Sequence, residues 1–536
     1  MKRIVVLAMT CLAAALPAQQ PRVERYEFRI VLPDTGKRIY GETRIRLAEQ
    51  PAVLLLELDL DGSMKVGGVE MGCGEPTNKA RFEHVGSSLR VPLTRIEGVD
   101  TRCVTILYSG EPRDGMIIGT DSAGRWTAFG DNFPDRARYW LPTVDHPSAK
   151  ARVTWTVEAP EGRTIVANGA LVSTSTNLDG RVTTTWHEDR AIPTYDMVFA
   201  AAPLVMHDLG RTACGFAEDG GCVPQMVYTA PEQARYLPGN FARAGEIVEF
   251  FSRTVGAYPY EKLAHVQSST RYGGMENASE IYYADQLFRK PNGLSEGLIA
   301  HETAHQWFGN AVTEREWAHA WLSEGFATFF AALWTQHTRG DSAYHSELSR
   351  LRQEVIRAKV ASERAVIDSV ETDPNRLLNE NTYQKGGWVL HMLRTQLGDS
   401  AFFAGVRRYF AEHKHGNAMT QDLQRSLEMS SGRELGWFFD QWLRRPGWAQ
   451  LSTAWHWDSA TKRVTLEVEQ ESRFGAYRLP LTIDVEVAGG GHRRMTVDVD
   501  AVRSQRLSLP GEFAAAPRAL VFDPDVSLLA AMTTRR

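Results

Sequence analysis

The chain has 536 residues, of which 43% are apolar and 23% are charged. These proportions are those of an ordinary globular protein, and the length leaves room for about three domains. The formal net charge of −5 provides no basic surface, so a function in binding nucleic acid or anionic lipid is not expected.

The first eighteen residues have the pattern of a secretory signal peptide. A basic start, Met1-Lys2-Arg3, precedes the apolar run of residues 4–16, and small residues follow up to Ala18. As a helix, that run would span only about 20 Å of a bilayer core that is roughly 30 Å thick. We therefore expect cleavage after Ala18 and export to the periplasm or the extracellular space, rather than an N-terminal membrane anchor. No later stretch is long and apolar enough to cross a membrane, so no stable membrane span is expected in the mature protein.

Four cysteines follow the expected cleavage point, and an even number in an oxidising compartment permits two disulfides. Cys214 and Cys222 flank a short glycine-rich turn, which favours a bond between them and leaves Cys73 to pair with Cys103. Four reduced thiols are the alternative.

Residues 25–205 alternate between apolar and polar positions and are rich in turn signals. The clearest runs are residues 25–32, 41–47, 104–108 and 151–157. A period of two bounded by Gly, Pro, Asp and Asn predicts strands of an antiparallel sheet, saddle or sandwich.

The period becomes helical from about residue 231. Ile247, Val248, Phe251 and Val255 share one face of a predicted helix, and we expect this face to pack in the core.

A short predicted strand, residues 263–267, leads into a loop that reads R-Y-G-G-M-E-N. The two adjacent glycines, Gly273 and Gly274, allow the backbone to approach a ligand closely. Glu276 on this loop is suited to bind the ammonium group of a substrate, because a carboxylate accepts strong charge-assisted hydrogen bonds. A solvated loop glutamate is the alternative.

The motif H-E-T-A-H begins at His301. His301 and His305 are separated by one helical turn, so both can reach one metal ion, and Glu302 lies beside them as a candidate general base. A catalytic zinc needs a third protein ligand and an open position for water. Glu324 follows after eighteen intervening residues, enough to end the helix, turn and begin a second one that completes a His2Glu site. The alternative for the bare motif is a surface helix with solvated histidines.

Helical periodicity continues to Pro446-Gly447, where it breaks. Alternation then returns in residues 464–469, 481–486 and 495–499, which predicts a small C-terminal β-sandwich.

Three motifs together resemble the M1 family of gluzincin zinc aminopeptidases, which includes aminopeptidase N and leukotriene A4 hydrolase. They are H-E-T-A-H-Q-W-F-G-N with the later W-L-S-E-G-F-A, the G-G-M-E-N segment, and Y-Q-K-G beginning at Tyr383. The resemblance implies that Gly273, Gly274, Met275, Glu276 and Asn277 bind substrate. It also implies that Tyr383 stabilises the negative oxygen of the reacting carbonyl, since a phenol can donate a hydrogen bond at pH 7. An ordinary core tyrosine is the alternative for Tyr383.

The resemblance also implies the overall fold, an α+β multidomain protein. The expected parts are a signal peptide (1–18), an N-terminal β saddle or sandwich (19–230), a thermolysin-like, mainly helical catalytic domain (231–447) and a C-terminal β-sandwich (448–536). The large helical C-terminal domain of many family members is not expected here.

The activity implied is that of a zinc-dependent aminopeptidase. One zinc ion per chain would be held by His301, His305 and Glu324, and peptides with a free N-terminus would be the substrates. A thermolysin-like endopeptidase and a non-catalytic peptide-binding protein of the same fold are the alternatives. The sequence does not predict the oligomeric state.

Family members also hold the substrate amine with a glutamine or glutamate from the N-terminal domain. The corresponding stretch here reads Gly130-Asp131-Asn132-Phe133. Asp131 or Asn132 is the candidate second anchor, with a plain turn as the alternative. Arg271 is a candidate contact to the substrate backbone.

Overall fold

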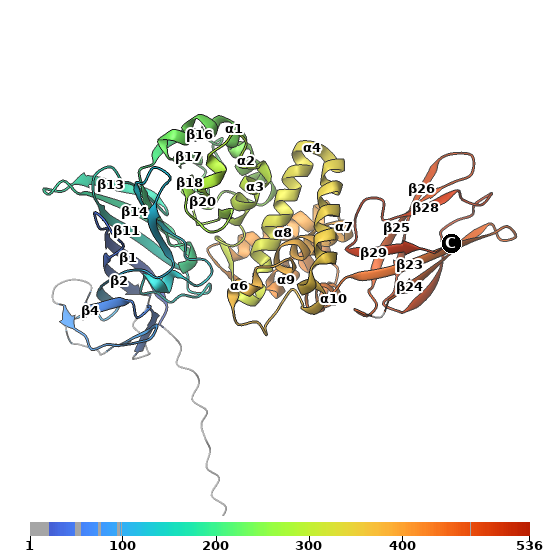
Figure 1. The fold of residues 1–536 in the computed structure, drawn as a ribbon. Coiled ribbons are helices and arrows are strands. Elements are labelled where there is room, and N and C mark those ends of the chain that lie inside the picture. The colour runs from blue at the N-terminus through green and yellow to red at the C-terminus, as the bar shows by residue number, and fades with distance from the viewer. Residues whose placement is uncertain are drawn as a thin grey trace, which may run out of the picture.

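The computed structural model describes residues 21–48, 55–72, 77–93, 97, 99–471 and 473–535. The expected signal peptide and Cys73 of the expected Cys73–Cys103 pair lie outside these residues. The described chain forms an N-terminal region of β-sheets, a helical middle region and a C-terminal region of β-sheets, arranged in that order along the molecule (Figure 1). This is the α+β architecture that the sequence predicts.

The N-terminal region contains three sheets. The largest has eight strands in the order β13-β14-β11-β1-β2-β8-β4-β5. Its strands are β1 (Val23–Val31), β2 (Ile39–Leu47), β4 (Met64–Met71), β5 (Asn78–Lys79), β8 (Cys103–Gly110), β11 (Ala151–Ala159), β13 (Ala170–Thr176) and β14 (Val182–Ile192). The neighbours are antiparallel, as predicted, except that β1 and β11 run parallel. The smaller sheets are formed by β3 (Leu55–Asp59), β7 (Ser88–Pro92) and β6 (Glu83–Val85), and by β12 (Thr164–Ala167), β15 (Phe199–Ala202), β10 (Trp126–Gly130) and β9 (Met116–Thr120).

The alternation of the N-terminal strands reflects one buried face. In β11, Val153, Trp155 and Val157 are buried while the residues between them are partly exposed. The ring of Trp155 stacks on Phe28 of β1 at 4.7 Å between centroids, so the period-two pattern fills a core with aromatic side chains.

Beside the three N-terminal sheets, a sheet of five strands lies next to the helical region (Figure 1). Its order is β16-β17-β18-β20-β19, formed by β16 (Val205–Arg211), β17 (Pro224–Thr229), β18 (Leu263–Ser268), β20 (Glu280–Ala284) and β19 (Gly274–Met275). Two of these strands, β16 and β17, precede residue 231, so the sheet begins before the predicted start of the catalytic domain. The position of that domain boundary stays a prediction. The edge strand β19 carries the start of the G-M-E-N segment.

Ten α-helices are found among the described residues. They are α1 (Leu237–Asn240), α2 (Ala244–Thr254), α3 (Glu296–His305), α4 (Trp321–Arg357), α5 (Lys359–Glu363), α6 (Pro374–Leu377), α7 (Gly386–Leu397), α8 (Asp399–His413), α9 (Thr420–Ser431) and α10 (Gly436–Leu443). The predicted face of α2 is buried, and α4 is interrupted at Gly340, where φ is 79°. None of these helices combines the length and the apolar character that a membrane span requires.

The C-terminal region is the predicted β-sandwich. One sheet has the order β27-β24-β23-β29 and the other β26-β25-β28. The strands are β23 (Ala449–Asp458), β24 (Arg463–Gln470), β25 (Leu479–Glu486), β26 (His492–Val499), β27 (Ser504–Ser508), β28 (Ala519–Phe522) and β29 (Ala530–Thr534).

One disulfide closes a turn, and one lysine connects the N-terminal region to the helical region. Cys214 and Cys222 form a disulfide, which confirms the predicted pair. Lys150 of the N-terminal region reaches into the helical region, where its Nζ donates to the carbonyl oxygens of Asn310, Ala311 and Gly416 at 2.7, 2.9 and 3.1 Å. The lysine thereby joins the segment that follows α3 to β22 (Gly416–Ala418).

Candidate active site

Helix α3 presents the two histidines of the H-E-T-A-H motif. It begins after the N-cap Ser295, whose Oγ accepts a hydrogen bond from the Leu298 amide at 3.1 Å. Capping fixes where the helix starts, and the spacing of four residues then places His301 and His305 on one face.

The three expected metal ligands meet. The Nε2 atoms of His301 and His305 are 3.2 Å apart, and Glu324 Oε2 lies 3.4 Å from the first and 3.2 Å from the second. In a tetrahedral site with bonds of about 2.0–2.1 Å, ligand atoms lie about 3.3 Å from one another. The cluster therefore fits one metal ion with a fourth position left for another ligand.

The chain between the two helices fixes the orientation of His305. Its Nδ1 lies 3.1 Å from the Phe308 carbonyl oxygen and 3.0 Å from Ser323 Oγ. A carbonyl can only accept, so Nδ1 carries the proton and the lone pair of Nε2 points to the ligand cluster. Gly309 has φ of 120°, and a Cβ there would lie 2.4 Å from Ser323 Oγ, which explains the glycine.

Glu302 lies beside the cluster, against the backbone of Gly274. A Cβ at Gly274 would lie 2.2 Å from Oε1 of Glu302, so only glycine leaves room for this carboxylate. A Cβ at Gly273 would meet nothing within 4 Å, so that glycine is not required by space. Of the two glycines in the motif, only Gly274 is needed to make room for Glu302.

The site concentrates negative charge. Burial, together with the carboxylates of Glu276 and Glu324, raises the pKa of Glu302 well above its usual range. Burial also raises the pKa of Glu276 to about 7, again with a contribution from Glu324. Burial would raise the pKa of Glu324 too, but the imidazoles of His305 and His301 outweigh it and lower that pKa to about 2. Three buried carboxylates around two imidazoles favour a bound cation.

Hydrogen bonds to its backbone carbonyl hold Glu276 in place, and its carboxylate faces the cavity. Its carbonyl oxygen accepts from Gln306 Nε2 and Asn310 Nδ2, both at 2.7 Å. The residue is 5% exposed, and its Oε1 has no hydrogen-bond partner among the described residues. A buried oxygen without a partner is costly, and a ligand that donates hydrogen bonds would relieve that cost.

Tyr383 lies in a π-helical turn, Asn381–Lys385, that packs on α4. Its hydroxyl donates to Glu324 Oε1 at 2.8 Å, and its ring stacks near His301 at 6.1 Å between centroids. A Cβ at Gly325 would lie 2.9 Å from the carbonyl carbon of Gly386, so these two glycines let the turn approach the helix beside Glu324.

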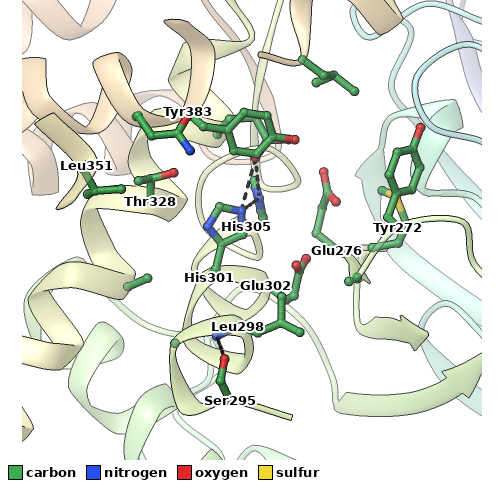
Figure 2. Close-up of a pocket in the computed structure, with 18 of the residues that line it drawn as sticks. Tyr272, Glu276, Ser295, Leu298, His301, Glu302, His305, Thr328, Leu351 and Tyr383 are labelled. Carbon is green, nitrogen blue, oxygen red and sulfur yellow. Dashed lines mark hydrogen bonds and ion pairs between the residues drawn. The ribbon is translucent and has the colours of Figure 1, made fainter. Parts of the chain in front are cut away.

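One cavity of about 540 Å³ is lined by the side chains described above that carry the candidate chemistry, namely His301, Glu302, His305, Glu324, Glu276 and Tyr383 (Figure 2). Gly273, Gly274, Met275 and Glu276 line it, as expected for substrate-binding residues. Asn277 does not belong to the lining. It is fully buried behind the loop, and its carbonyl oxygen accepts from Gln306 Nε2 at 3.4 Å.

The candidates for a second amine anchor do not reach the cavity. Asn132 is buried, and both ends of its side-chain amide are hydrogen-bonded. Its Nδ2 donates to the Met197 carbonyl oxygen and its Oδ1 accepts from Trp140 Nε1, both at 2.7 Å. Asp131 is fully buried between two arginines, and neither residue lines the cavity. The lining residue from this stretch is Phe133. Nothing in the sequence signals it, because one aromatic residue in a loop has no chemical signature.

Arg271 also has a different place from the one expected. It forms ion pairs with Asp114 and, at 3.4 Å, with Asp131, both of the N-terminal region. Arg136 pairs with the same two carboxylates at 3.2 and 3.1 Å. This four-residue ion-pair network fastens the start of the substrate-binding loop to the N-terminal region.

A His2Glu cluster with a neighbouring carboxylate, in a cavity between a helical region and a β region, is the arrangement of a metallopeptidase. Two family models agree with this class: the Peptidase family M1 domain matches residues 240–442 and the Peptidase M1 N-terminal domain matches residues 75–195. The chain belongs to peptidase family M1.

Curated relatives and a solved structure are consistent with this family. The chain is 29% identical to Aminopeptidase N of Streptomyces lividans over 74% of its own length and 47% of that protein. It is 26% identical to Leucyl aminopeptidase of Saccharolobus solfataricus over 87% of its length and 59% of that protein. The fold matches the crystal structure of Legionella pneumophila aminopeptidase A in complex with aspartic acid, with a TM-score of 0.80 and 18% identity, over 98% of this chain and 61% of that one. The chain thus spans about half the length of the curated relatives it matches.

Proposed function

We propose that the protein is an exported, zinc-dependent aminopeptidase that removes the N-terminal residue from peptides. The observation that carries this proposal is the buried Glu276 carboxylate, which lies in the same cavity as the three-ligand cluster. One of its oxygens has no hydrogen-bond partner in the described part of the chain. Export is inferred from the signal-peptide pattern of residues 1–18.

Zinc is the metal we propose for the cluster. Two imidazole nitrogens and one carboxylate oxygen are a donor set that zinc accepts in catalytic sites, and the separations of 3.2–3.4 Å suit its bond lengths. When bound, zinc acts as a Lewis acid that acidifies a coordinated water and polarises a carbonyl. His301, His305 and Glu324 would hold it.

Glu302 is the proposed general base. Its carboxylate is buried in the cavity, and no hydrogen-bond partner competes for it in the part of the chain that the structure describes. It would accept a proton from the attacking water and deliver the same proton to the leaving amine.

Tyr383 is the proposed donor to the carbonyl oxygen as negative charge develops there. Its hydroxyl lies 2.8 Å from Glu324 Oε1, at the edge of the ligand cluster, and burial keeps its pKa well above the usual range. The phenol therefore stays protonated near neutral pH and can donate.

Tyr383→Phe should lower kcat by roughly 100-fold, or about 3 kcal/mol, because a donor used in the transition state is lost. Zinc content should not change, since the phenol is not a ligand. Tyr260→Phe is the matched control, because its hydroxyl is buried without a hydrogen-bond partner. Steady-state kinetics of both variants beside metal analysis checks this, and an unchanged kcat in Tyr383→Phe removes the residue from the mechanism.

The exopeptidase proposal is tested by blocking the substrate amine. The enzyme should hydrolyse aminoacyl-arylamides and leave their N-acetylated forms uncut, because Glu276 binds an ammonium group. Glu276→Gln should reduce kcat/KM for free-amine substrates by roughly 100- to 1,000-fold, as expected when one partner of a buried charge pair is removed. Equal cleavage of free and acetylated peptides would favour the endopeptidase, and no cleavage of either would favour a peptide-binding protein.

A further inference from the structure

The cavity has two sides, separated by the ligand cluster. In Figure 2, Glu276 and Tyr272 lie on one side of His301 and His305, and Leu351 lies on the other. If the amine of a substrate binds Glu276 while its first carbonyl lies at the metal site, the first side chain has to lie on the Glu276 side. The rest of the peptide then leaves on the opposite side.

We propose that Phe133 makes this first-residue pocket selective for large apolar and aromatic side chains. The inference rests on the proposed aminopeptidase function and names the substrate class of that same site. Phe133 is the lining residue supplied by the N-terminal region, from the loop that follows β10.

The lining on this side is apolar. Phe133 and Met275 belong to one buried cluster, and Tyr272 and Leu378 pack against it. All four line the cavity, whereas Glu347 and Arg350, which are also lining residues, come from the second half of α4 together with Leu351. An apolar side chain on the first residue of the substrate would therefore leave water and contact apolar surface, which is favourable.

Phe133 is held as a fixed wall. Its ring makes edge-to-face contacts with Tyr195 at 5.1 Å and Trp317 at 5.4 Å between centroids. Its carbonyl oxygen accepts from Arg136 Nε at 2.7 Å and from Tyr272 OH at 3.4 Å. Since both backbone and ring are fixed, the wall does not have to become ordered when substrate binds.

Among the described residues that line this side of the cavity, Phe133, Tyr272, Met275 and Leu378 offer no charged partner to a first side chain. Asp131, which precedes Phe133 by two residues, is fully buried between Arg136 and Arg271 and does not line the cavity, so it cannot bind a cation there. Glu276 would already hold the α-amine, and it would repel a second carboxylate. An unpaired charge in a mostly apolar pocket is strongly disfavoured.

The experiment is a panel of aminoacyl-arylamides hydrolysed by the zinc-loaded full chain. For the wild type, we expect kcat/KM for leucyl, methionyl and phenylalanyl substrates to exceed that for the alanyl substrate by roughly 10- to 100-fold. Glutamyl, lysyl and arginyl substrates should fall below leucyl by at least about tenfold.

Two alanine variants then test whether Phe133 causes the preference for large apolar first residues. Phe133→Ala should lower the leucyl-to-alanyl ratio of kcat/KM by about tenfold, because the wall is removed. Phe129→Ala is the matched control: Phe129 lies in the same buried cluster but does not line this cavity, so its ratio should stay that of the wild type. A ratio, unlike a rate, is not changed by a loss of folded protein.

The outcomes separate the two levels of inference. Failure to cut any free-amine substrate overturns the proposed aminopeptidase function itself. Cleavage with an equal or a charged preference overturns the inference about the pocket while the function stands. An equal change of the ratio in both variants removes Phe133 as the determinant, and the wild-type panel decides the substrate class even if Phe133→Ala does not fold.

Discussion

Glu302→Gln is expected to lower kcat by roughly 100- to 10,000-fold, the range in which positioned general bases contribute. Glutamine has the shape of glutamate, so it should fit the space that Gly274 leaves for it. Its amide cannot accept the proton of the attacking water. Metal binding should be retained, because Glu302 is not one of the three clustered ligands.

The measurement combines steady-state hydrolysis of a leucyl-arylamide with metal analysis of the same preparation. Glu280→Gln is a suitable control, since Glu280 is fully buried outside the cavity, and burial raises its pKa to about 8. Burial favours the neutral form of this carboxyl, which an amide resembles, so the substitution should have little consequence. A Glu302→Gln enzyme with a nearly normal rate would contradict the assignment of the base.

Removal of the metal is expected to abolish turnover and to lower the melting temperature. Chelation would leave the carboxylates of Glu276, Glu302 and Glu324 buried around the cavity without the cation that balances their charge. A ligand that binds only the folded state stabilises it by mass action, about 4 kcal/mol at a thousandfold excess over Kd. Adding one equivalent of zinc should restore both activity and melting temperature.

Variants of the proposed metal ligands test whether activity depends on the bound metal. Glu324→Gln should lose zinc and activity together. His319→Gln is the control, because His319 is a buried histidine that lies between the ligands in sequence and contacts Thr420 Oγ1 at 2.7 Å instead of the cluster. Full activity in a preparation stripped of metal would remove the metallopeptidase mechanism.

The sequence predicted the parts of the site that are local. His301, Glu302 and His305 lie within one turn of a helix, so their relation follows from the helical repeat alone. Glu324 was expected from the eighteen residues that separate it from His305, and the resemblance to family M1 supplied Tyr383. The fold brings these two residues to the cluster from α4 and from the π-helical turn.

The parts that were missed depend on contacts between distant segments. Asp131 was a candidate amine anchor because it lies in the stretch where family members place a glutamine or glutamate. Its partner Arg271 comes 140 residues later and cannot be predicted from periodicity. The parallel pairing of β1 with β11 is similarly distant, and alternation is the same for parallel and antiparallel neighbours when one face is buried.

The lysine that crosses between the regions bears on how substrate enters. Swinging the N-terminal region away from the segment that follows α3 would break the three hydrogen bonds that Lys150 donates to carbonyl oxygens. These bonds disfavour a hinge at this boundary. For the proposed aminopeptidase, a cavity that is entered without such a movement would admit a slender, unfolded peptide end more readily than the terminus of a folded protein.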